Sequence, residues 1–195
     1  MRMESTTNLP PPSSWRSLSE SQARKVEAIS ATLLSHLDYM TDRRLQKAYY
    51  LAEVWSIEER LERLSQVDFA SWRHGPWSLH VREGTERLES RGAVERVIKL
   101  ADDGLEVEFL KVTSPVESPE LRREEAEFLV DVSAALRFMK SEKLTHVAKA
   151  TTPFQPTPPE ARIDLDAYLE SLKQRHAKLV NSPKVAALVA EAKAA

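Results

Sequence analysis

Apolar residues recur at helical spacing along the first part of the chain. The first stripe consists of Val26, Ile29, Leu33, Leu37 and Met40. Residues three or four positions apart lie on the same face of an α-helix, so this stripe predicts a helix with one buried face. Ser19 precedes the stripe and is a residue type that commonly caps helix N-termini. We therefore expect the first helix to begin near Ser19.

A second, wider stripe begins after Thr41 and Asp42, either of which can cap a helix. It consists of Leu45, Ala48, Tyr49, Ala52 and Trp55, with Leu51 and Val54 beside them. Apolar residues on more than one face predict a central helix that packs on several sides. The segment Ser56-Ile57-Glu58-Glu59 then has the capping-box pattern, which predicts a separate short helix to about Ser65.

The next segment contains a tryptophan-rich turn. The run at 67–72 predicts a short extended piece. Pro76 suits the first turn of a helix, because its missing N–H would have no partner there. Gly92 is typical of a helix C-terminus. We therefore expect a helix from Pro76 to about Ser90.

Two alternating runs, at 94–100 and 105–112, follow this helix. Asp102-Asp103-Gly104 lies between them and is a strong signal for a hairpin turn. Because two strands do not form a stable sheet alone, we expect this hairpin, residues 93–112, to pack against helices.

The last third of the chain is again helical in pattern. Ser118-Pro119 predicts the start of a long amphipathic helix. A short helix is predicted at 142–149, and four prolines at 151–159 predict an extended linker. Another helix is expected from about Asp164, and an Ala-rich one from Ser182. The predicted fold class is mainly α, as a single helical domain with one β-hairpin inserted between helices. The predicted boundaries are a flexible N-terminal tail at 1–17, the helical domain at 18–180, and a C-terminal helix or tail at 181–195.

Composition narrows the function classes. The chain has 195 residues, a net charge of −2, four glycines and no cysteine. Thiolate metal sites and disulfides are therefore excluded, and no glycine-rich phosphate loop can form. No run of about 18 apolar residues predicts a membrane span, and the polar start lacks the apolar core of a signal peptide. We expect a cytoplasmic protein without membrane contact and without a cofactor.

The predicted helix at 76–91 followed by a hairpin is typical of the end of a winged helix, which would contact DNA. The contacts would be Arg73, His80, Arg82, Arg87, Arg91, Arg96 and Lys99. Several glutamates lie among these residues and would repel phosphates. The alternative is a solvated face with ion pairs one turn apart, such as Glu83–Arg87.

Catalytic and metal sites find little support in the sequence. His74, His80 and His146 could serve a hydrolase, but no nucleophile elbow and no metal-ligand spacing accompanies them. The Tyr49-Tyr50 pair could form a binding surface, although such a stripe is more often core with one hydroxyl reaching solvent. Between the two tryptophans of the turn, we expect Trp72 in the core and Trp77 exposed.

Two motifs in order nevertheless resemble those of the Panacea domain. The first is Met40-Thr41-Asp42-Arg43-Arg44-Leu45-Gln46-Lys47-Ala48-Tyr49-Tyr50-Leu51, and the second is Trp72-Arg73-His74-Gly75-Pro76. A weaker third match is Leu144-Thr145-His146 with Pro153-Phe154 downstream. The resemblance spans about residues 20–175. The matching motif residues, which we interpret as scaffold, are Leu45, Gln46, Lys47, Tyr49, Tyr50, Trp72, Gly75, Pro76, Thr145 and His146.

The resemblance implies a mainly helical cytoplasmic protein of bacterial, phage or mobile-element origin. It implies the antitoxin of a type II toxin–antitoxin pair, which neutralises its cognate toxin by direct protein–protein contact. It supplies no catalytic residues, so we expect no enzyme. The candidate partner-binding residues are Arg73, His74, Trp77, His80, Arg87 and Arg91. DNA binding, with autoregulation of the operon, is the alternative function.

Overall fold

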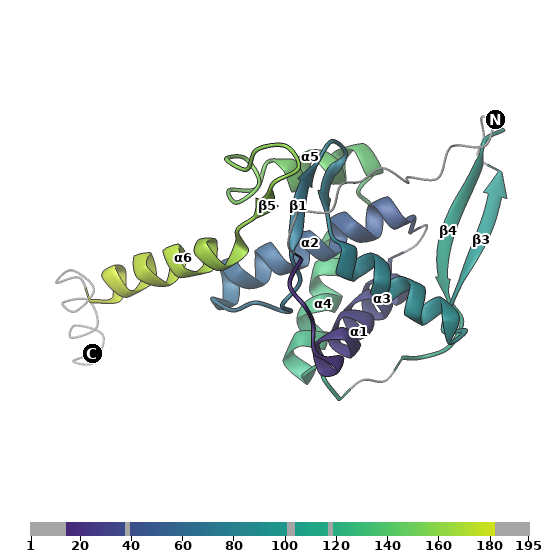
Figure 1. Ribbon diagram of the computed structural model, residues 1–195, viewed down its shortest axis with the longest axis horizontal. Coiled ribbons are helices and arrows are strands. Elements are labelled where there is room, and N and C mark those ends of the chain that lie inside the picture. Colours follow the sequence, from purple (N-terminus) through teal and green to yellow (C-terminus); the bar gives the residue numbers. More distant parts are fainter. Residues whose placement is uncertain (1–14, 38–39, 101–103, 117–118, 182–195) are drawn as a thin grey trace, which may run out of the picture.

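Helix α2, Asp42–Arg60, runs through the centre of the protein (Figure 1). The computed structural model describes residues 15–37, 40–100, 104–116 and 119–181. The other helices are α1 (Glu20–His36), α3 (Leu79–Ser90), α4 (Arg123–Leu136), α5 (Ser141–Lys149) and α6 (Leu165–Val180). Helix α2 contacts all five of them. The mainly helical fold class is therefore confirmed.

The sequence places α1 and α2 correctly. Ser19 caps α1 in a capping box with Gln22, and Thr41 caps α2 by accepting a hydrogen bond from the Arg44 N–H. Every residue from Leu45 to Val54 is buried, which confirms a central helix packed on several sides. Helix α1 packs against both α3 and α4, so its apolar stripe faces two neighbours.

Two small antiparallel sheets accompany the helices, where only one hairpin was predicted. Strands β1 (Phe69–Trp72) and β2 (Gly75–Trp77) form a hairpin, and β5 (Arg162–Ile163) pairs with the other edge of β1. Strand β5 is two residues long and lies between the predicted linker at 151–159 and the helix expected from about Asp164, where no strand was predicted. Its pairing depends on a long-range contact, and such a short strand leaves no periodicity in the sequence.

The second sheet is the predicted hairpin. Strands β3 (Val94–Leu100) and β4 (Glu106–Val112) pair with Val94 opposite Val112, so the predicted strands are confirmed. The predicted turn residues 102–103 lie outside the described residues. The backbone N–H of Leu110 donates to the Met40 carbonyl at 2.7 Å, which attaches the hairpin to the segment before α2.

Two local predictions are wrong because tertiary contacts override a local signal. The capping box at Ser56 does not start a helix: α2 continues to Arg60, and the buried Ser56 hydroxyl donates to the Glu62 carbonyl at 3.0 Å. Pro76 does not start a helix either. It lies in β2, an edge strand where a missing N–H is tolerated, and α3 begins only at Leu79.

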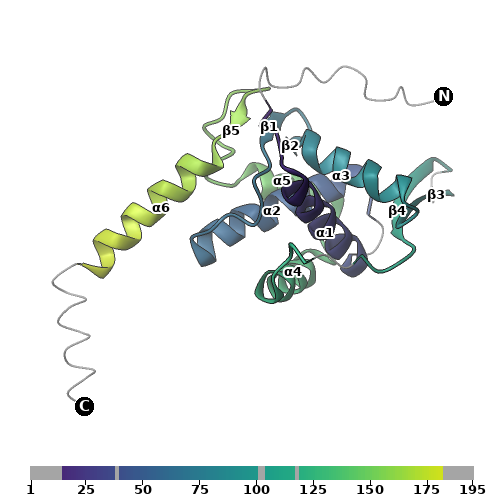
Figure 2. The same cartoon turned by 60° about the horizontal axis from the view of Figure 1, so that its bottom comes forward.

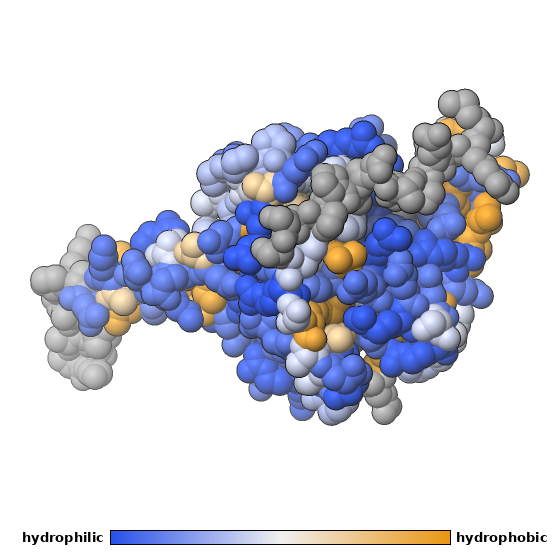
Figure 3. All heavy atoms as spheres, in the orientation of Figure 1, coloured by the Kyte–Doolittle hydropathy of each residue, from blue (hydrophilic) through white to orange (hydrophobic). Residues whose placement is uncertain are grey.

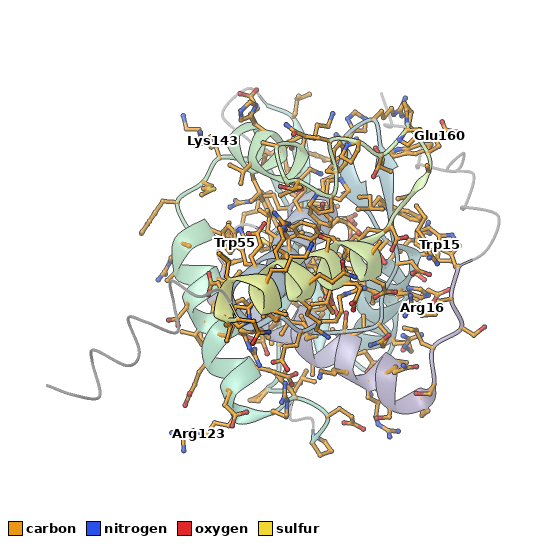
Figure 4. All side chains as sticks on the ribbon, turned by 90° about the vertical axis from the view of Figure 1, so that its left-hand side faces the viewer. Trp15, Arg16, Trp55, Arg123, Lys143 and Glu160 are labelled. Atoms are coloured by element: carbon orange, nitrogen blue, oxygen red, sulfur yellow. The ribbon has the colours of Figure 1, made fainter. Side chains whose placement is uncertain are left out.

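The ends of the described chain differ in how they meet the domain. Helix α6 extends away from the other helices (Figures 1 and 2). Within the predicted N-terminal tail, Trp15 and Arg16 contact the domain on the side along which the chain enters (Figure 4). Residues 1–14 of that tail and the predicted helix after Ser182 lie outside the described residues. No helix within the described ranges combines the length and apolarity that a membrane span requires.

Gln46 connects the central helix to the junction between β2 and α3. Its side-chain amide donates to the Ser78 carbonyl at 3.0 Å and accepts from the Ser78 N–H at 2.7 Å. Both residues are buried, so water cannot replace these bonds. The Gln46 amide thereby holds the start of α3 against α2, because it makes the donor and acceptor bonds to the Ser78 backbone that a neighbouring strand would otherwise make.

Replacing Gln46 should therefore destabilise the fold strongly. Gln46→Leu leaves the buried Ser78 N–H without a partner and removes one of the two hydrogen bonds to the Ser78 carbonyl, which keeps the Arg82 N–H at 3.3 Å. We expect a loss of about 1–3 kcal/mol of unfolding free energy. Urea unfolding followed by circular dichroism measures it. Gln155→Leu is the matched control, because Gln155 is exposed, and it should stay within about 0.5 kcal/mol of wild type. Equal effects of the two substitutions would contradict this role of Gln46.

Candidate functional site

Most motif residues of the central helix are core residues. Leu45, Tyr49 and Tyr50 have at most 1% of their surface exposed. The Tyr50 hydroxyl pairs with the Thr151 hydroxyl at 2.8 Å, and both tyrosine rings contact Phe69. Burial raises the pKa of both tyrosines. The prediction that one tyrosine hydroxyl reaches solvent is therefore wrong, and the pair offers no surface to a partner.

Lys47 departs from this pattern, because it lies at a surface pocket. The pocket has a volume of about 200 Å³ and is formed by the start of α2, the β1–β2 turn and α5. We call it the Lys47 pocket. Its lining residues are Arg43, Arg44, Lys47, Arg73, His74, Ser141, Glu142 and Thr145. Four residues singled out from the sequence thus meet here, from three motifs far apart in the chain: Lys47, Arg73, His74 and Thr145.

The Lys47 side chain is 4% exposed and sits among positive charges. Its Nζ donates to the Arg43 carbonyl at 3.1 Å, one turn earlier in α2. Burial, together with the charges of Arg43 and Lys149, lowers the pKa of Lys47 to about 8. Burial and the same set of cations also lower the pKa of His74, which is exposed at the turn. The pocket therefore carries an unbalanced positive potential.

Gly75 allows the β1–β2 turn to lie against Lys47. Its φ is +100°, and a Cβ placed there would be 3.3 Å from Cε of Lys47 and 3.8 Å from Cγ2 of Thr145. A larger residue would therefore be both strained and crowded. The Lys149 Nζ donates to the Arg73 carbonyl at 2.8 Å and ties the turn to α5. The Trp-x-x-Gly-Pro motif thus serves to close one wall of the pocket.

His80 and Trp77 do not lie on a free surface, which corrects two predicted partner contacts. His80 is 4% exposed: its Nε2 lies 2.8 Å from the Arg16 carbonyl, and its Nδ1 accepts from the Asp68 N–H at 3.3 Å. These contacts assign the neutral tautomer with hydrogen on Nε2. Trp15 packs edge-on against both His80 and Trp77, each at 5.6 Å between centroids. Both residues therefore dock the N-terminal segment. Trp72 and Trp77 are both half-buried, so the expected contrast between a core Trp72 and an exposed Trp77 is wrong.

Arg87 and Arg91 also have internal partners. Both guanidinium groups bind the buried carboxylate of Glu27 on α1, with Arg87 Nε at 2.7 Å. Arg87 thus pairs with Glu27 on α1, whereas the solvated-face alternative had paired it with Glu83 one turn earlier. Arg96 binds Asp42, Glu89 and Glu108. Apart from Arg73, the arginines of the predicted DNA contact set are thus occupied by carboxylates, which weighs against the DNA-binding alternative.

The histidines of the hydrolase hypothesis are not brought together. His74 lines the Lys47 pocket, His80 lies in the core, and His146 is exposed on α5 without lining that pocket. Among the described residues, no three histidine, aspartate or glutamate side chains are placed to hold a metal ion.

Sequence reasoning missed two groups that matter. Arg43 lines the Lys47 pocket, and the charge of Lys149 acts on Lys47 without lining it. Only the spacing of Arg43 four residues before Lys47 could have indicated this. The second group is an ion network that runs from the core to the surface: Arg63 binds the buried Glu53 at 3.0 Å and the exposed Asp166 at 2.6 Å. Its members lie up to 113 positions apart, and no local pattern connects them.

Comparisons of the chain with protein-family models, curated proteins and solved structures give no significant match. The resemblance to the Panacea domain therefore stays a prediction that rests on the motifs alone.

The lowered pKa of Lys47 predicts a pH dependence of stability. Between pH 8 and 10 the unfolded chain binds more protons at this residue than the folded one, so folding gains stability as pH rises. We expect this gain, up to about 3 kcal/mol, to disappear in Lys47→Met. Urea titrations across this pH range measure it. Lys143→Met, on the exposed outer side of α5 (Figure 4), should keep the wild-type slope. A wild-type slope in Lys47→Met would contradict the assignment.

The close approach at Gly75 gives a second prediction. Gly75→Ala should cost about 1–3 kcal/mol, because it adds backbone strain and crowds Lys47. Gly92→Ala is the matched control: its φ of +69° carries a similar strain, but nothing lies within 4 Å of the added Cβ. Thermal unfolding should therefore show a larger loss for Gly75→Ala. Equal losses would mean that contact with Lys47 does not matter there.

Proposed function

We propose that this protein is a non-catalytic, antitoxin-like protein that neutralises a toxin by binding it directly. The proposal combines the two ordered motifs with one structural observation, the apolar surface of the β3–β4 hairpin. Ile98 is 62% exposed and Leu100 is 74% exposed. Figure 3 displays these apolar residues along the hairpin at the right-hand edge of the molecule.

The position of the hairpin supports a role in binding. Among the helices, the hairpin contacts mainly α1, through β4, and α3, through β3. Its strands extend beyond the helices (Figure 1). Within the pairing, Ile98 is opposite Glu108 and Leu100 is opposite Glu106. Exposed apolar side chains bordered by charges are typical of protein–protein contact sites.

The opposite side of the hairpin adds a groove. The groove has a volume of about 820 Å³ and lies between the end of α1 and the two strands. Leu34 and Leu37 of α1 and Val97 and Phe109 of the hairpin contribute apolar side chains to it. The same groove also carries polar and basic residues, among them Lys99 and Lys111. A concave site of this mixed character would receive a projecting side chain of a toxin, which is how binding energy concentrates at interfaces.

Co-expression with the product of the adjacent gene tests the proposal. We expect that product to arrest growth alone and growth to recover when this protein is co-expressed. The double variant Ile98→Asp/Leu100→Asp should abolish the recovery, because it places two charges in the contact. A harmless neighbour, or a toxin that remains active beside the wild-type protein, would refute the function.

The control variant separates loss of binding from loss of folding. Val130→Asp alters an apolar residue of α4 that is 42% exposed and lies away from the hairpin. It should neutralise the toxin like wild type. If it fails as completely as the hairpin variant while both fold normally by circular dichroism, the hairpin is not the binding surface.

A further inference from the structure

The Lys47 pocket contains a charge imbalance that the described part of the fold does not neutralise. Within ion-pair distance of Lys47 Nζ, Arg43 or Arg73, the described residues place no carboxylate. Elsewhere the arrangement is different, since Arg87 and Arg96 bind carboxylates directly. Of the residues that the structure describes, Glu142 is the single acidic one lining the pocket.

Such an arrangement is unfavourable while the pocket holds only water. Lys47 is almost fully buried, and burial of a cation without an anion costs free energy. The neighbouring charges of Arg43 and Lys149 add repulsion. A bound anion would reverse both effects, because it would supply the missing countercharge where water is largely excluded. A core without function could place an apolar residue at this position instead.

We propose that the Lys47 pocket binds the phosphate group of a small molecule. Lys47 would act as a point charge at the base, and the guanidinium groups of Arg43 and Arg73 would provide paired donors at the rim. Leaving Arg44 aside, the described lining sets Arg43, Arg73 and Lys47 against the carboxylate of Glu142, so a dianion balances the charge better than a single carboxylate does. The volume of about 200 Å³ is below the usual range of about 300–1,000 Å³ for drug-sized ligands, which suits a small anion.

The pocket is formed by three segments that a bound phosphate would link. The start of α2, the β1–β2 turn and α5 each contribute lining residues. A ligand that binds only this folded arrangement stabilises it by mass action. The inference does not depend on the proposed antitoxin function, since the Lys47 pocket and the β3–β4 hairpin share no residue.

Calorimetric titration of the full chain tests the proposal. The ligands are inorganic phosphate, glycerol phosphate and acetate, each at constant ionic strength with chloride as the background anion. We expect one phosphate site per chain, a rise in melting temperature with phosphate, and no comparable effect of acetate. Tighter binding of glycerol phosphate than of phosphate would assign a phosphorylated metabolite, and equal binding would assign the free ion.

Variants locate the site. Arg43→Gln/Arg73→Gln changes two exposed residues, so it should fold, and we expect roughly tenfold weaker phosphate binding or more. Lys47→Met should abolish binding. Arg123→Gln is the control, because Arg123 is an exposed arginine of α4 far from the pocket (Figure 4), and it should bind like wild type.

Three results would overturn the inference. The first is no phosphate binding up to about 10 mM, a concentration that detects even weak sites. The second is wild-type phosphate binding in Arg43→Gln/Arg73→Gln. The third is acetate or an acidic peptide binding as tightly as phosphate, which would assign the pocket to carboxylates of a protein partner instead.

Discussion

The middle of helix α2, residues 45–54, is buried on all sides and yet carries polar side chains, and this constraint shapes the rest of the structure. Gln46, Lys47 and Glu53 are each at most 6% exposed. A buried polar group costs free energy unless it finds a partner. Gln46 bonds to the Ser78 backbone, and Glu53 bonds to Arg63 and the Ser65 hydroxyl. Lys47 Nζ donates only to the Arg43 carbonyl, so of these three residues it is the one whose hydrogen-bonding and charge requirements are not fully met.

These partnerships determine how distant segments attach to the centre. Arg63 reaches from Glu53 to Asp166 in the first turn of α6, and Arg16 binds the same carboxylate at 2.6 Å. Burial opposes the charge of Asp166, but the bond from Arg16 and the charge of Arg63 lower its pKa overall. The N-terminal segment and the base of α6 therefore depend on one ion network that starts at the buried Glu53. Function can then reside at the periphery, in the β3–β4 hairpin and at the Lys47 pocket.

Residue patterns predicted those elements whose burial follows a regular period. The stripe of α1, the wide stripe of α2 and the alternation at 94–100 all had the correct type. Failures occurred where a strong local signal competed with a contact far along the chain. Ser56 has a helix-capping sequence but is buried inside α2, and Pro76 has a helix-start signal but lies in an edge strand. The extended piece predicted at 67–72 contains β1, but its partner β2 was missed, because three residues are too short for a period to show.

The candidate sites likewise combine features that the sequence predicted with features that depend on the tertiary structure. The sequence by itself determined the helical class, the position of the β3–β4 hairpin and the residue types that now line the Lys47 pocket, because periodicity and turn chemistry are local properties. Only the tertiary structure decided which charges are neutralised. Arg87 meets Glu27 across 60 positions, whereas Arg73 and Lys47 meet other cations. Electrostatic pairing depends on distance in space, and a one-dimensional pattern carries no information on it.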